Sequence, residues 1–371
     1  MERREFLSLA AKGAFGAAAL AACSTGDSNL DEALQNDSLP TVEWELPTSW
    51  PVALDTIYGG AERFAERVTA LTGGKFTITA KPGGEVVPAL EILQSVQNGT
   101  IDAGHTASYY YVGLAQLNAF GTALPFGLTA RQNDAWLHEG GGLDMMQQVY
   151  ADRFNAIQFP AGNTGTQMGG WFRKEIASLA DLQGLRMRIP GLGGAVMEKL
   201  GVLVQVIPGG EIFQALQTSA VDAAEWVGPY DDQKLDLQSV SDFYYYPGWW
   251  EPGPTLEVQI SLDSWNKLPE EYQEVIKSAA YEANTTMLAK YDALNPGALQ
   301  EILSNSDITL LPFPDDVMQA AEEAAFELYD ENAAADEDFA SIFDNWKAFR
   351  SDIQEWHGVA EKAMSNYQSQ F

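Results

Sequence analysis

Apolar positions recur along the chain with two spacings that alternate from one segment to the next. In residues 61–71, Phe64, Val68 and Leu71 fall on one face of a helix, which should stop at the two glycines that follow. In residues 75–81, apolar and polar side chains alternate, as they do in a half-buried strand. A chain that alternates helix and strand is typical of an α/β protein. Further helix-like and strand-like segments follow over residues 86–98, 101–105, 155–162, 184–189, 195–200, 202–207, 212–218 and 221–226.

From residue 269 onward the pattern becomes helical. A long helix is predicted over residues 269–302, because Pro269 and the two acids after it make a favourable first turn. Pro296 should bend or break this helix, since proline lacks the amide hydrogen that a helix interior needs. Residues 315–366 predict further acidic, amphipathic helices.

Two parts of the chain resemble each other. Gly-Gly-Glu at residues 83–85 precedes a helix and Ile-Asp-Ala at 101–103, and Gly-Gly-Glu at 209–211 precedes a helix and Val-Asp-Ala at 221–223. Two related β-α-β units, one in each of two lobes, would explain this similarity, and chance explains it equally well.

The first residues have the composition of an export signal. Arg3 and Arg4 precede an Ala-rich apolar stretch that ends with Leu-Ala-Ala before Cys23. A basic start, a short apolar stretch and small residues predict a secretory signal over residues 1–22, and the paired arginines indicate the twin-arginine route. The alternative is a buried N-terminal helix.

Cys23 and the residues after it predict a lipid anchor followed by a tether. The position of Cys23 resembles the lipobox of bacterial lipoproteins, and the alternative is ordinary cleavage near Ala22. Residues 23–45 are expected to form an acidic tether, because much of this stretch is too polar to bury a core. The folded domain is expected over residues 46–371.

Composition narrows the class of protein. With 371 residues, of which 46% are hydrophobic, the chain can bury a large core, and its length suggests two lobes. A formal net charge of −31 repels nucleic acid and anionic lipid, so neither is expected as a partner. The acidity indicates either a saline habitat or simply a need for solubility.

Few residues are suited to catalysis. The three histidines, His105, His138 and His357, form no metal-binding pair, and the single cysteine belongs to the signal. The glycines at residues 191–194 only weakly imitate a phosphate-binding loop. We therefore expect neither an enzyme nor an organic cofactor, and a tethered scaffold protein is the other alternative.

Five blocks of sequence carry a resemblance to a known family. They are Gly-Asn-Thr-Gly-Thr-Gln-Met-Gly-Gly-Trp-Phe at 162–172, Leu-Arg-Met-Arg-Ile-Pro-Gly at 185–191, Pro-Gly-Gly-Glu-Ile at 208–212, Ala-Glu-Trp-Val-Gly-Pro-Tyr at 224–230 and Tyr-Tyr-Tyr-Pro-Gly-Trp-Trp-Glu-Pro-Gly at 244–253. From about residue 50 to residue 303 the chain resembles the periplasmic solute receptors of TRAP (tripartite ATP-independent periplasmic) transporters. The best match is the subgroup that binds 2-oxo acids such as pyruvate, or lactate.

The resemblance implies a fold, a ligand and partners. The fold would be two α/β lobes that close on a ligand, joined by crossing strands and braced by a long helix. The ligand would be a small monocarboxylate, either a 2-oxo acid or, as the alternative, lactate or another 2-hydroxy acid. The partners would be the two membrane subunits of a transporter, and the location would be the periplasm. The long helix is a candidate contact for a homodimer.

Arg188 is the first candidate for the ligand site. A guanidinium group can bind a carboxylate through two parallel hydrogen bonds, and Arg188 ends an apolar strand just before Pro190. From the residues alone, a surface ion pair is an equal alternative. The resemblance places the ligand-binding arginine at this position.

The resemblance also implies a bound cation. Its ligands would be Gln167, Glu225 and the main-chain oxygen of Trp226, and the bound solute would complete the set. Oxygen ligands suit Na⁺ or Ca²⁺. Glu251 is a further candidate, and with it Ca²⁺ would balance the charges better than Na⁺. For Glu225 the alternative is an ordinary acid at the end of a strand.

Several aromatic residues are candidates for lining the site. Tyr109 or Tyr110 is a candidate to offer a hydroxyl group to the ligand, and core packing is expected for at least two of the three tyrosines at 109–111. Trp171, Trp226 and Trp249 are candidates for an apolar wall beside the arginine, with core packing as the alternative for each.

Overall fold

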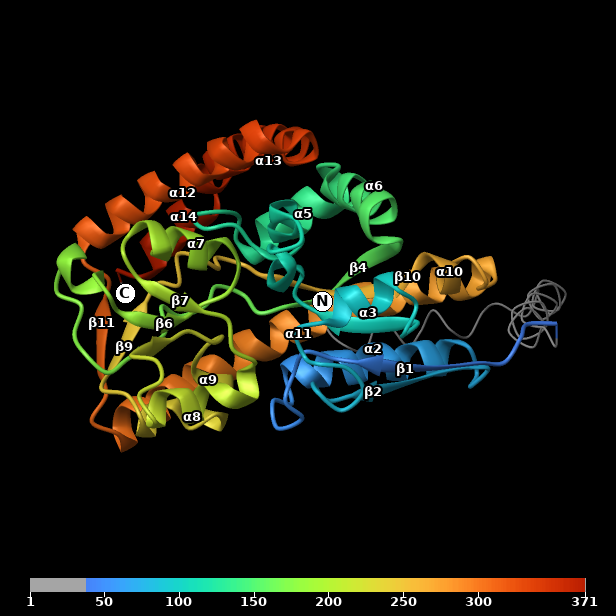
Figure 1. The fold of residues 1–371 in the computed structure, drawn as a ribbon, viewed down its shortest axis with the longest axis horizontal. Helices are drawn as coiled ribbons and strands as arrows, with labels where there is room; N and C mark the ends of the chain where they lie inside the picture. Colours follow the sequence, from blue (N-terminus) through green and yellow to red (C-terminus); the bar gives the residue numbers. More distant parts are fainter. Residues whose placement is uncertain (1–37, 371) are drawn as a thin grey trace, which may run out of the picture.

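The computed structural model describes residues 38–370, which form two lobes with helices running along both (Figure 1). The chain builds most of the first lobe, crosses to the second, and returns to the first for one central strand and the start of a long helix. The signal sequence predicted over residues 1–22 and the lipidation predicted at Cys23 lie outside the described residues.

The first lobe is built around strand β10, which pairs antiparallel with β3 on one side and β4 on the other. Strands β1 and β2 are parallel, and a bridge between Thr48 and His105 joins β1 to β3. Val258 and Ile260 of β10 share one apolar core with residues of the helices α2 and α11. The strands are β1 (Val42–Pro47), β2 (Phe76–Lys81), β3 (Ala103–Thr106), β4 (Ala156–Asn163) and β10 (Thr255–Ser261). The helices, including 3₁₀ helices (η), are α2 (Ile57–Leu71), α3 (Ile92–Gln97), η1 (Ser108–Tyr111), η2 (Gln116–Asn118), α4 (Ala119–Thr122), α5 (Ala130–Glu139), α6 (Gly142–Phe154) and α10 (Leu262–Trp265).

Two predicted boundaries in this lobe were wrong. Strand β1 begins at Val42, so the last residues of the tether predicted over 23–45 belong to the sheet. The helix predicted over 86–98 is shorter, because α3 begins only at Ile92. Pro88 accounts for part of the difference, because it disfavours a helical conformation for Val87, the residue before it.

The second lobe is a six-stranded sheet in the order β11-β9-β5-β8-β6-β7 with helices on both faces. On one face Met187 and Ala223 belong to the largest core, which includes residues of α7 and α12, and on the other Trp171 and Tyr244 share a core with residues of α8 and α11. The strands are β5 (Trp171–Phe172), β6 (Arg186–Arg188), β7 (Leu203–Gln205), β8 (Ala223–Ala224), β9 (Phe243–Tyr246) and β11 (Thr309–Pro312). The helices are η3 (Leu179–Leu182), α7 (Gly191–Lys199), η4 (Gly209–Glu211), α8 (Ile212–Gln217), α9 (Pro229–Lys234) and η5 (Leu237–Ser239).

Helix α11 (Glu270–Asn305) is 36 residues long and packs on both lobes, as predicted for a bracing helix. Ala279 and Ala283 lie in the core of the first lobe, and Met287 and Tyr291 pack with Trp226 and its neighbours. Of the bend or break predicted at Pro296, the break does not occur, because the helix continues through the proline. Pro296 and Asp292 are exposed, so water can bond to the carbonyl group of Asp292 that the proline leaves without a donor.

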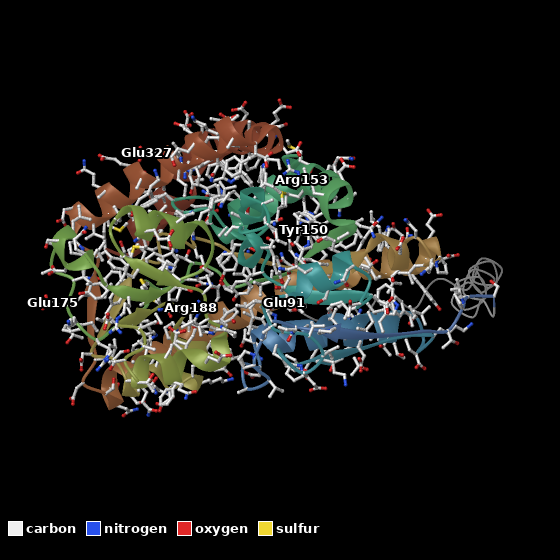
Figure 2. The ribbon with its side chains drawn as sticks, in the orientation of Figure 1. Glu91, Tyr150, Arg153, Glu175, Arg188 and Glu327 are labelled. Carbon is white, nitrogen blue, oxygen red and sulfur yellow. The ribbon has the colours of Figure 1, made fainter. Side chains whose placement is uncertain are left out.

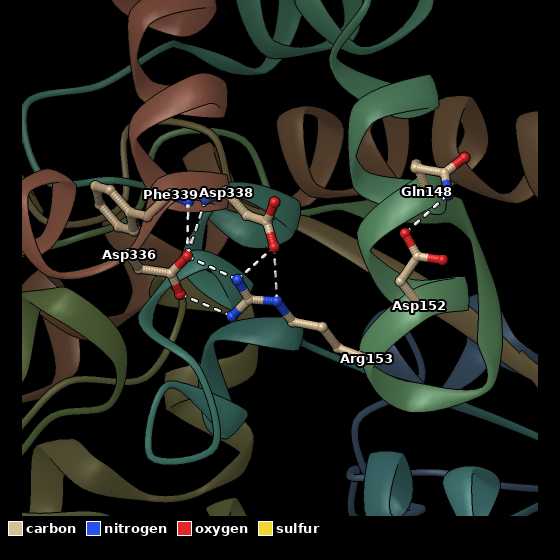
Figure 3. Close-up of polar contacts among 6 residues, drawn as sticks. All are labelled: Gln148, Asp152, Arg153, Asp336, Asp338 and Phe339. Carbon is tan, nitrogen blue, oxygen red and sulfur yellow. Dashed lines mark hydrogen bonds and ion pairs between the residues drawn. The ribbon is translucent and has the colours of Figure 1, made fainter.

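The chain ends in three helices that cover the first lobe and part of the second. They are α12 (Asp315–Ala335), α13 (Glu337–Val359) and α14 (Glu361–Gln368). Arg153 of α6 binds the turn between the first two: its Nη1 and Nη2 donate to Asp336 at 2.7 Å each, and its Nε donates to Asp338 at 2.9 Å (Figure 3). Asp336 in turn accepts the amide hydrogens of the first turn of α13, so one residue caps the helix and fixes it to α6. Among the described helices, none is both long enough and apolar enough to cross a membrane.

Candidate functional site

Arg188 and Glu225 are brought together by neighbouring parallel strands. Arg188 is the last residue of β6, Glu225 directly follows β8, and Arg188 pairs with Ala224 across the two strands. The amide of Glu225 also donates to the carbonyl oxygen of Arg188 at 3.2 Å. Carboxyl ends of parallel strands are the usual place for a ligand in an α/β sheet. Figure 2 shows Arg188 in the interior of the molecule.

Gln167 and Glu251 come from the two segments that connect the lobes. Gln167 lies between β4 and β5, and Glu251 lies between β9 and β10. The segments are joined by main-chain hydrogen bonds, from the Gln167 amide to the Glu251 carbonyl at 3.1 Å and from the Gly248 amide to the Gln167 carbonyl at 2.9 Å. A Cβ atom at Gly248 would lie 2.6 Å from the Met168 carbonyl oxygen, so this contact requires glycine.

The guanidinium group of Arg188 is held on several sides. Its side chain is 1% exposed, and it pairs with the Glu225 carboxylate. Nε donates to the Ile207 carbonyl at 3.0 Å, Nη1 donates to the Glu225 carbonyl at 3.1 Å, and the ring of Trp226 lies 5.3 Å from the guanidinium carbon. A guanidinium fixed in this way is preorganised to bind a carboxylate at its remaining edge.

Buried polar atoms without a hydrogen-bond partner gather around this arginine. Buried polar groups in folded proteins nearly always have partners, and exceptions point to a ligand, ion or water. Within residues 38–370, five site residues each carry such an atom. They are Nη2 of Arg188, Oε2 of Glu225, Oε2 of Glu251, Oε1 of Gln167 and Nε1 of Trp226.

The two carboxyl groups of the site hold their protons more tightly than usual. Burial, opposed by Arg188 and reinforced by Asp232, raises the pKa of Glu225 to about 7. Burial and the nearby Glu225 raise the pKa of Glu251 well above its ordinary value, and Arg188 and Tyr109 oppose this shift. One arginine therefore faces two acids, and a bound cation would favour the charged form of both.

Two of the three consecutive tyrosines face the site from the first lobe. Tyr109 and Tyr110 of η1 are stacked with their ring centroids 4.9 Å apart; Tyr110 faces Arg188 and Tyr109 faces Glu251. Tyr111 instead shares a 2.8 Å hydrogen bond with Thr106 in the core. Tyr109 and Tyr111 both belong to hydrophobic cores, as predicted for at least two of the three tyrosines, and Tyr109 faces the site as well.

The tryptophans divide between the site and the core. Trp226 covers Arg188, and a Cβ atom at Gly209 would lie 2.3 Å from its ring. Trp171 is fully buried, stacks on a core tyrosine at 3.9 Å between ring centroids and donates to Asp232 at 2.8 Å. Trp249 stacks on a phenylalanine at 5.1 Å between centroids. Trp171 packs in the core and is linked to the site through Asp232, and its role in lining the ligand stays a prediction.

Asp232 is a further residue beside the site that the sequence did not predict. It accepts hydrogen bonds from the amides of Val227 at 3.2 Å and Gly228 at 3.0 Å, and so holds the turn that directly follows Trp226. Its charge also acts on Glu225. An acid four residues after a glycine at the start of a helix was the available signal, and it is too common in sequences to be specific.

The oxygen atoms at the site fit a hard cation. The free side-chain oxygens of Glu225, Glu251 and Gln167 are of the kind that Na⁺ and Ca²⁺ prefer, and the main-chain oxygen of Trp226, a predicted ligand, would complete an oxygen-only set. Across the described residues, no three His, Cys, Asp or Glu side chains lie together in a metal-binding arrangement. A cation here would therefore depend on an amide and a main-chain oxygen as well as on two acids.

His105, the one histidine close to these elements, has a structural role. Its Nδ1 accepts a hydrogen bond from Trp50 at 2.7 Å, so its Nε2 carries the proton and donates to the Ala161 carbonyl at 3.2 Å. Burial lowers its pKa to about 4, which keeps the ring neutral. It is therefore a fixed hydrogen-bonding group rather than a general base for catalysis.

Comparison with known proteins gives consistent matches over the folded part of the chain. Residues 48–336 match bacterial extracellular solute-binding protein, family 7. The chain is 53% identical over 369 residues to the monocarboxylate 2-oxoacid-binding periplasmic protein of Nostoc sp., and the match covers 100% of this chain and 99% of the relative.

Two crystal structures add information about ligands in similar proteins. A TRAP transporter solute-binding protein from Bordetella bronchiseptica, with copurified calcium and picolinate, is 46% identical, with a TM-score of 0.87, and covers 89% of this chain and 97% of its own. A TRAP periplasmic solute-binding protein from Pseudoalteromonas atlantica, with bound sodium and pyruvate, is 34% identical, with a TM-score of 0.85, and covers 89% of this chain and 99% of its own.

Proposed function

This chain belongs to bacterial extracellular solute-binding protein family 7, and we propose that its solute is a small 2-oxo acid, such as pyruvate, bound together with a cation. Members of the family are receptors that deliver solutes to transporters, so the chain is a receptor and not an enzyme. The relative from Nostoc sp. supports the ligand class, and the two crystal structures support a cation beside the ligand.

The proposal rests mainly on one observation: a buried donor of Arg188 has no hydrogen-bond partner among the described residues, and neither has one carboxyl oxygen of each nearby glutamate. The ligand carboxylate would accept hydrogen bonds from Nη2 of Arg188, which makes no hydrogen bond with any described residue. Tyr110 faces the same guanidinium group and can donate to the ligand as well. A 2-oxo acid carries a keto oxygen on the carbon next to its carboxylate, which suits simultaneous contact with an arginine and a cation.

Gln167, Glu225, Glu251 and the main-chain oxygen of Trp226 would hold the cation. A bound cation would supply positive charge to the keto and carboxylate oxygens of the ligand. Arg188 and a monocarboxylate cancel each other in charge. Two ionised glutamates are balanced by Ca²⁺, whereas Na⁺ balances Glu225 alone if Glu251 stays protonated; its raised pKa favours that state.

The site supports a receptor mechanism based on closure. Arg188 and Glu225 belong to the second lobe, Tyr109 and Tyr110 to the first, and Gln167 and Glu251 to the connecting segments. A ligand that touches all three parts favours the closed arrangement, because only that arrangement makes every contact. Closure also excludes water, which strengthens the contacts to charged groups. The closed receptor would then bind the membrane subunits of a TRAP transporter.

The N-terminal sequence supports a proposal for how the protein is exported and anchored. Arg3 and Arg4 support export by the twin-arginine route, and Cys23 supports a lipid anchor. The chain would then work on the outer face of the cytoplasmic membrane, next to its transporter.

A panel of small acids tests the ligand class. Pyruvate, 2-oxobutyrate and 2-oxoisovalerate should raise the unfolding temperature more than succinate or malate, because a second carboxylate would meet acids and aromatic rings and lose its water without gaining a partner. Each CH₂ of a buried tail should add about 0.8 kcal/mol. Lactate is the matched control, since it differs from pyruvate only at the 2-oxo group. Tighter binding of succinate than of pyruvate would contradict the proposal. Tighter binding of lactate than of pyruvate would show that the ligand is a 2-hydroxy acid rather than a 2-oxo acid.

A further inference from the structure

We propose that Thr164 is a positioning residue for the cation, because its hydroxyl group decides which end of the Gln167 amide faces the site. This inference rests on the cation site proposed above. Thr164 directly follows β4, at the start of the first connecting segment, and is 2% exposed.

Thr164 takes part in two hydrogen bonds, as the acceptor in one and the donor in the other. Its Oγ1 accepts a hydrogen bond from Nε2 of Gln167 at 3.1 Å and donates its own hydrogen to the Gly165 carbonyl oxygen at 3.1 Å. Asn163 supports the turn that presents this carbonyl, because its Oδ1 accepts from the Gly165 amide at 2.8 Å. Gly165 has a φ of +72°, which a residue with a side chain rarely adopts.

These hydrogen bonds determine the orientation of the Gln167 amide, which the shape of a glutamine side chain leaves open. The two ends of the amide have nearly the same shape, but one end donates hydrogen bonds and the other accepts them. A hydroxyl group has one hydrogen, and at Thr164 that hydrogen goes to Gly165. Thr164 can therefore only accept from Gln167, which turns the NH₂ group toward Thr164 and Oε1 away from it. Oε1 is buried and has no partner among the described residues, as expected of an oxygen kept for a cation.

A reversed amide would harm the site in two ways. Its NH₂ group would face the cation with the same sign of charge, and its oxygen would face the lone pairs of Thr164. Outer-shell partners that fix the orientation of a metal ligand typically change metal affinity by 10- to 100-fold when they are removed.

The position of Gln167 itself does not depend on Thr164. The main chain of Gln167 is held by hydrogen bonds to Gly248 and Glu251, and the Thr164 amide donates to the Pro254 carbonyl at 3.2 Å. Loss of the Thr164 hydroxyl group should therefore leave the connecting segments in place and free only the amide. This separation makes the inference testable.

The test compares Thr164→Val, which keeps the shape but loses the hydroxyl group, with Thr164→Ser, which keeps the hydroxyl group. Each chelator-treated protein is titrated with Ca²⁺ at saturating pyruvate by calorimetry, and its unfolding temperature is measured without either ligand. We expect Ca²⁺ affinity to fall about 10- to 100-fold in Thr164→Val and to stay near wild type in Thr164→Ser. The unfolding temperature of both variants without ligands should stay close to that of wild type. Thr164→Ala takes the place of the valine variant if that variant does not fold.

Repeating the Thr164→Val substitution in a Gln167→Ala protein shows whether its effect on Ca²⁺ affinity depends on Gln167. In Gln167→Ala the amide is absent, so Thr164→Val should weaken Ca²⁺ no further. Equal Ca²⁺ affinity in wild type and Thr164→Val would overturn the inference, as would additive losses in the double variant or a serine variant as weak as the valine variant. If wild type itself binds no cation, the proposed cation site fails instead, and the inference fails with it.

Discussion

Two arginines on one short strand show how burial decides function at the scale of a residue. Arg186 and Arg188 are both in β6, two positions apart. Arg186 is 40% exposed and donates from Nη2 and Nε to Asp222 at 2.6 and 2.9 Å, so both of these donors are used. Arg188 is buried and keeps Nη2 free of any described partner. The sequence pattern shows two arginines, and only the structure shows that Arg188 is the one with a buried donor left without a described partner.

Replacing Arg188 should remove ligand binding without unfolding the protein. Loss of a buried, charge-assisted contact typically costs roughly 2–5 kcal/mol, which corresponds to about 30-fold to several thousand-fold in affinity. The measurement is calorimetric titration of pyruvate into Arg188→Ala, with Arg186→Ala as the matched control from the same strand. The control should bind pyruvate as wild type does. Wild-type affinity in Arg188→Ala would remove this residue from the site.

At the scale of elements, the sequence predicted the order of helices and strands better than their pairing. Strands β2, β4 and β6 and helix α11 lie where the patterns place them. Strand β10 was missed, although Thr-Leu-Glu-Val-Gln-Ile-Ser alternates as a strand should. The alternation indicates one exposed polar face, whereas all seven residues are buried. The contact between Gln167 and Glu251 could not be predicted, because it joins two connecting segments far apart in the sequence and depends on glycine at 248.

The similar sequences at residues 83–103 and 209–223 form the same pair of elements, a helix followed by a strand, one pair in each lobe. The first copy contains α3 followed by β3 in the first lobe, and the second contains α8 followed by β8 in the second lobe. Both helices have six residues. The two copies therefore hold corresponding places in the two lobes.

The contact between α9 and α11 should make stability depend on pH. Asp231 of α9 is buried and accepts a hydrogen bond from Tyr291 of α11 at 2.6 Å, and burial raises its pKa from 3.8 to about 7. The folded protein thus binds this proton more tightly than the unfolded chain does. The resulting stabilisation is complete below about pH 4 and is lost as the pH rises to about 7, by about 1.4 kcal/mol per pH unit at most.

Asp231→Asn isolates this effect, because asparagine keeps the acceptor for Tyr291 and cannot ionise. The free energy of unfolding by urea is measured for wild type and variant from pH 4 to pH 8. The difference, wild type minus variant, should fall as the pH rises toward 7 and then level off. A difference that stays constant over this range would show that Asp231 does not hold the raised pKa.

For the whole molecule, the dominant physical feature is its charge. A formal charge of −31 makes the folded protein repel itself, and dissolved salt screens this repulsion because the Debye length falls from about 30 Å at 0.01 M to about 10 Å at 0.1 M. The same charge disfavours nucleic acid as a partner. The acidic surface should therefore make the protein more stable in salt.

Thermal unfolding in increasing choline chloride, with chelator present, measures this screening without filling the cation site. We expect the unfolding temperature to rise by several degrees between 0.01 and 0.3 M. Sucrose at matched osmolality is the control for effects that do not depend on charge. An unfolding temperature that falls with choline chloride would show that self-repulsion does not limit stability.

The proposed function requires that a cation and a 2-oxo acid bind together on Arg188, Glu225 and Gln167. The direct measurement is calorimetric titration of pyruvate into chelator-treated protein without added cation, with Na⁺ and with Ca²⁺, at an ionic strength held constant by choline chloride. Pyruvate affinity should rise roughly 5- to 150-fold with the right cation, and pyruvate should raise the affinity for that cation by the same factor. Glu225→Gln should reduce this gain. Identical pyruvate affinity in all three buffers would contradict binding of the cation and the 2-oxo acid at one site.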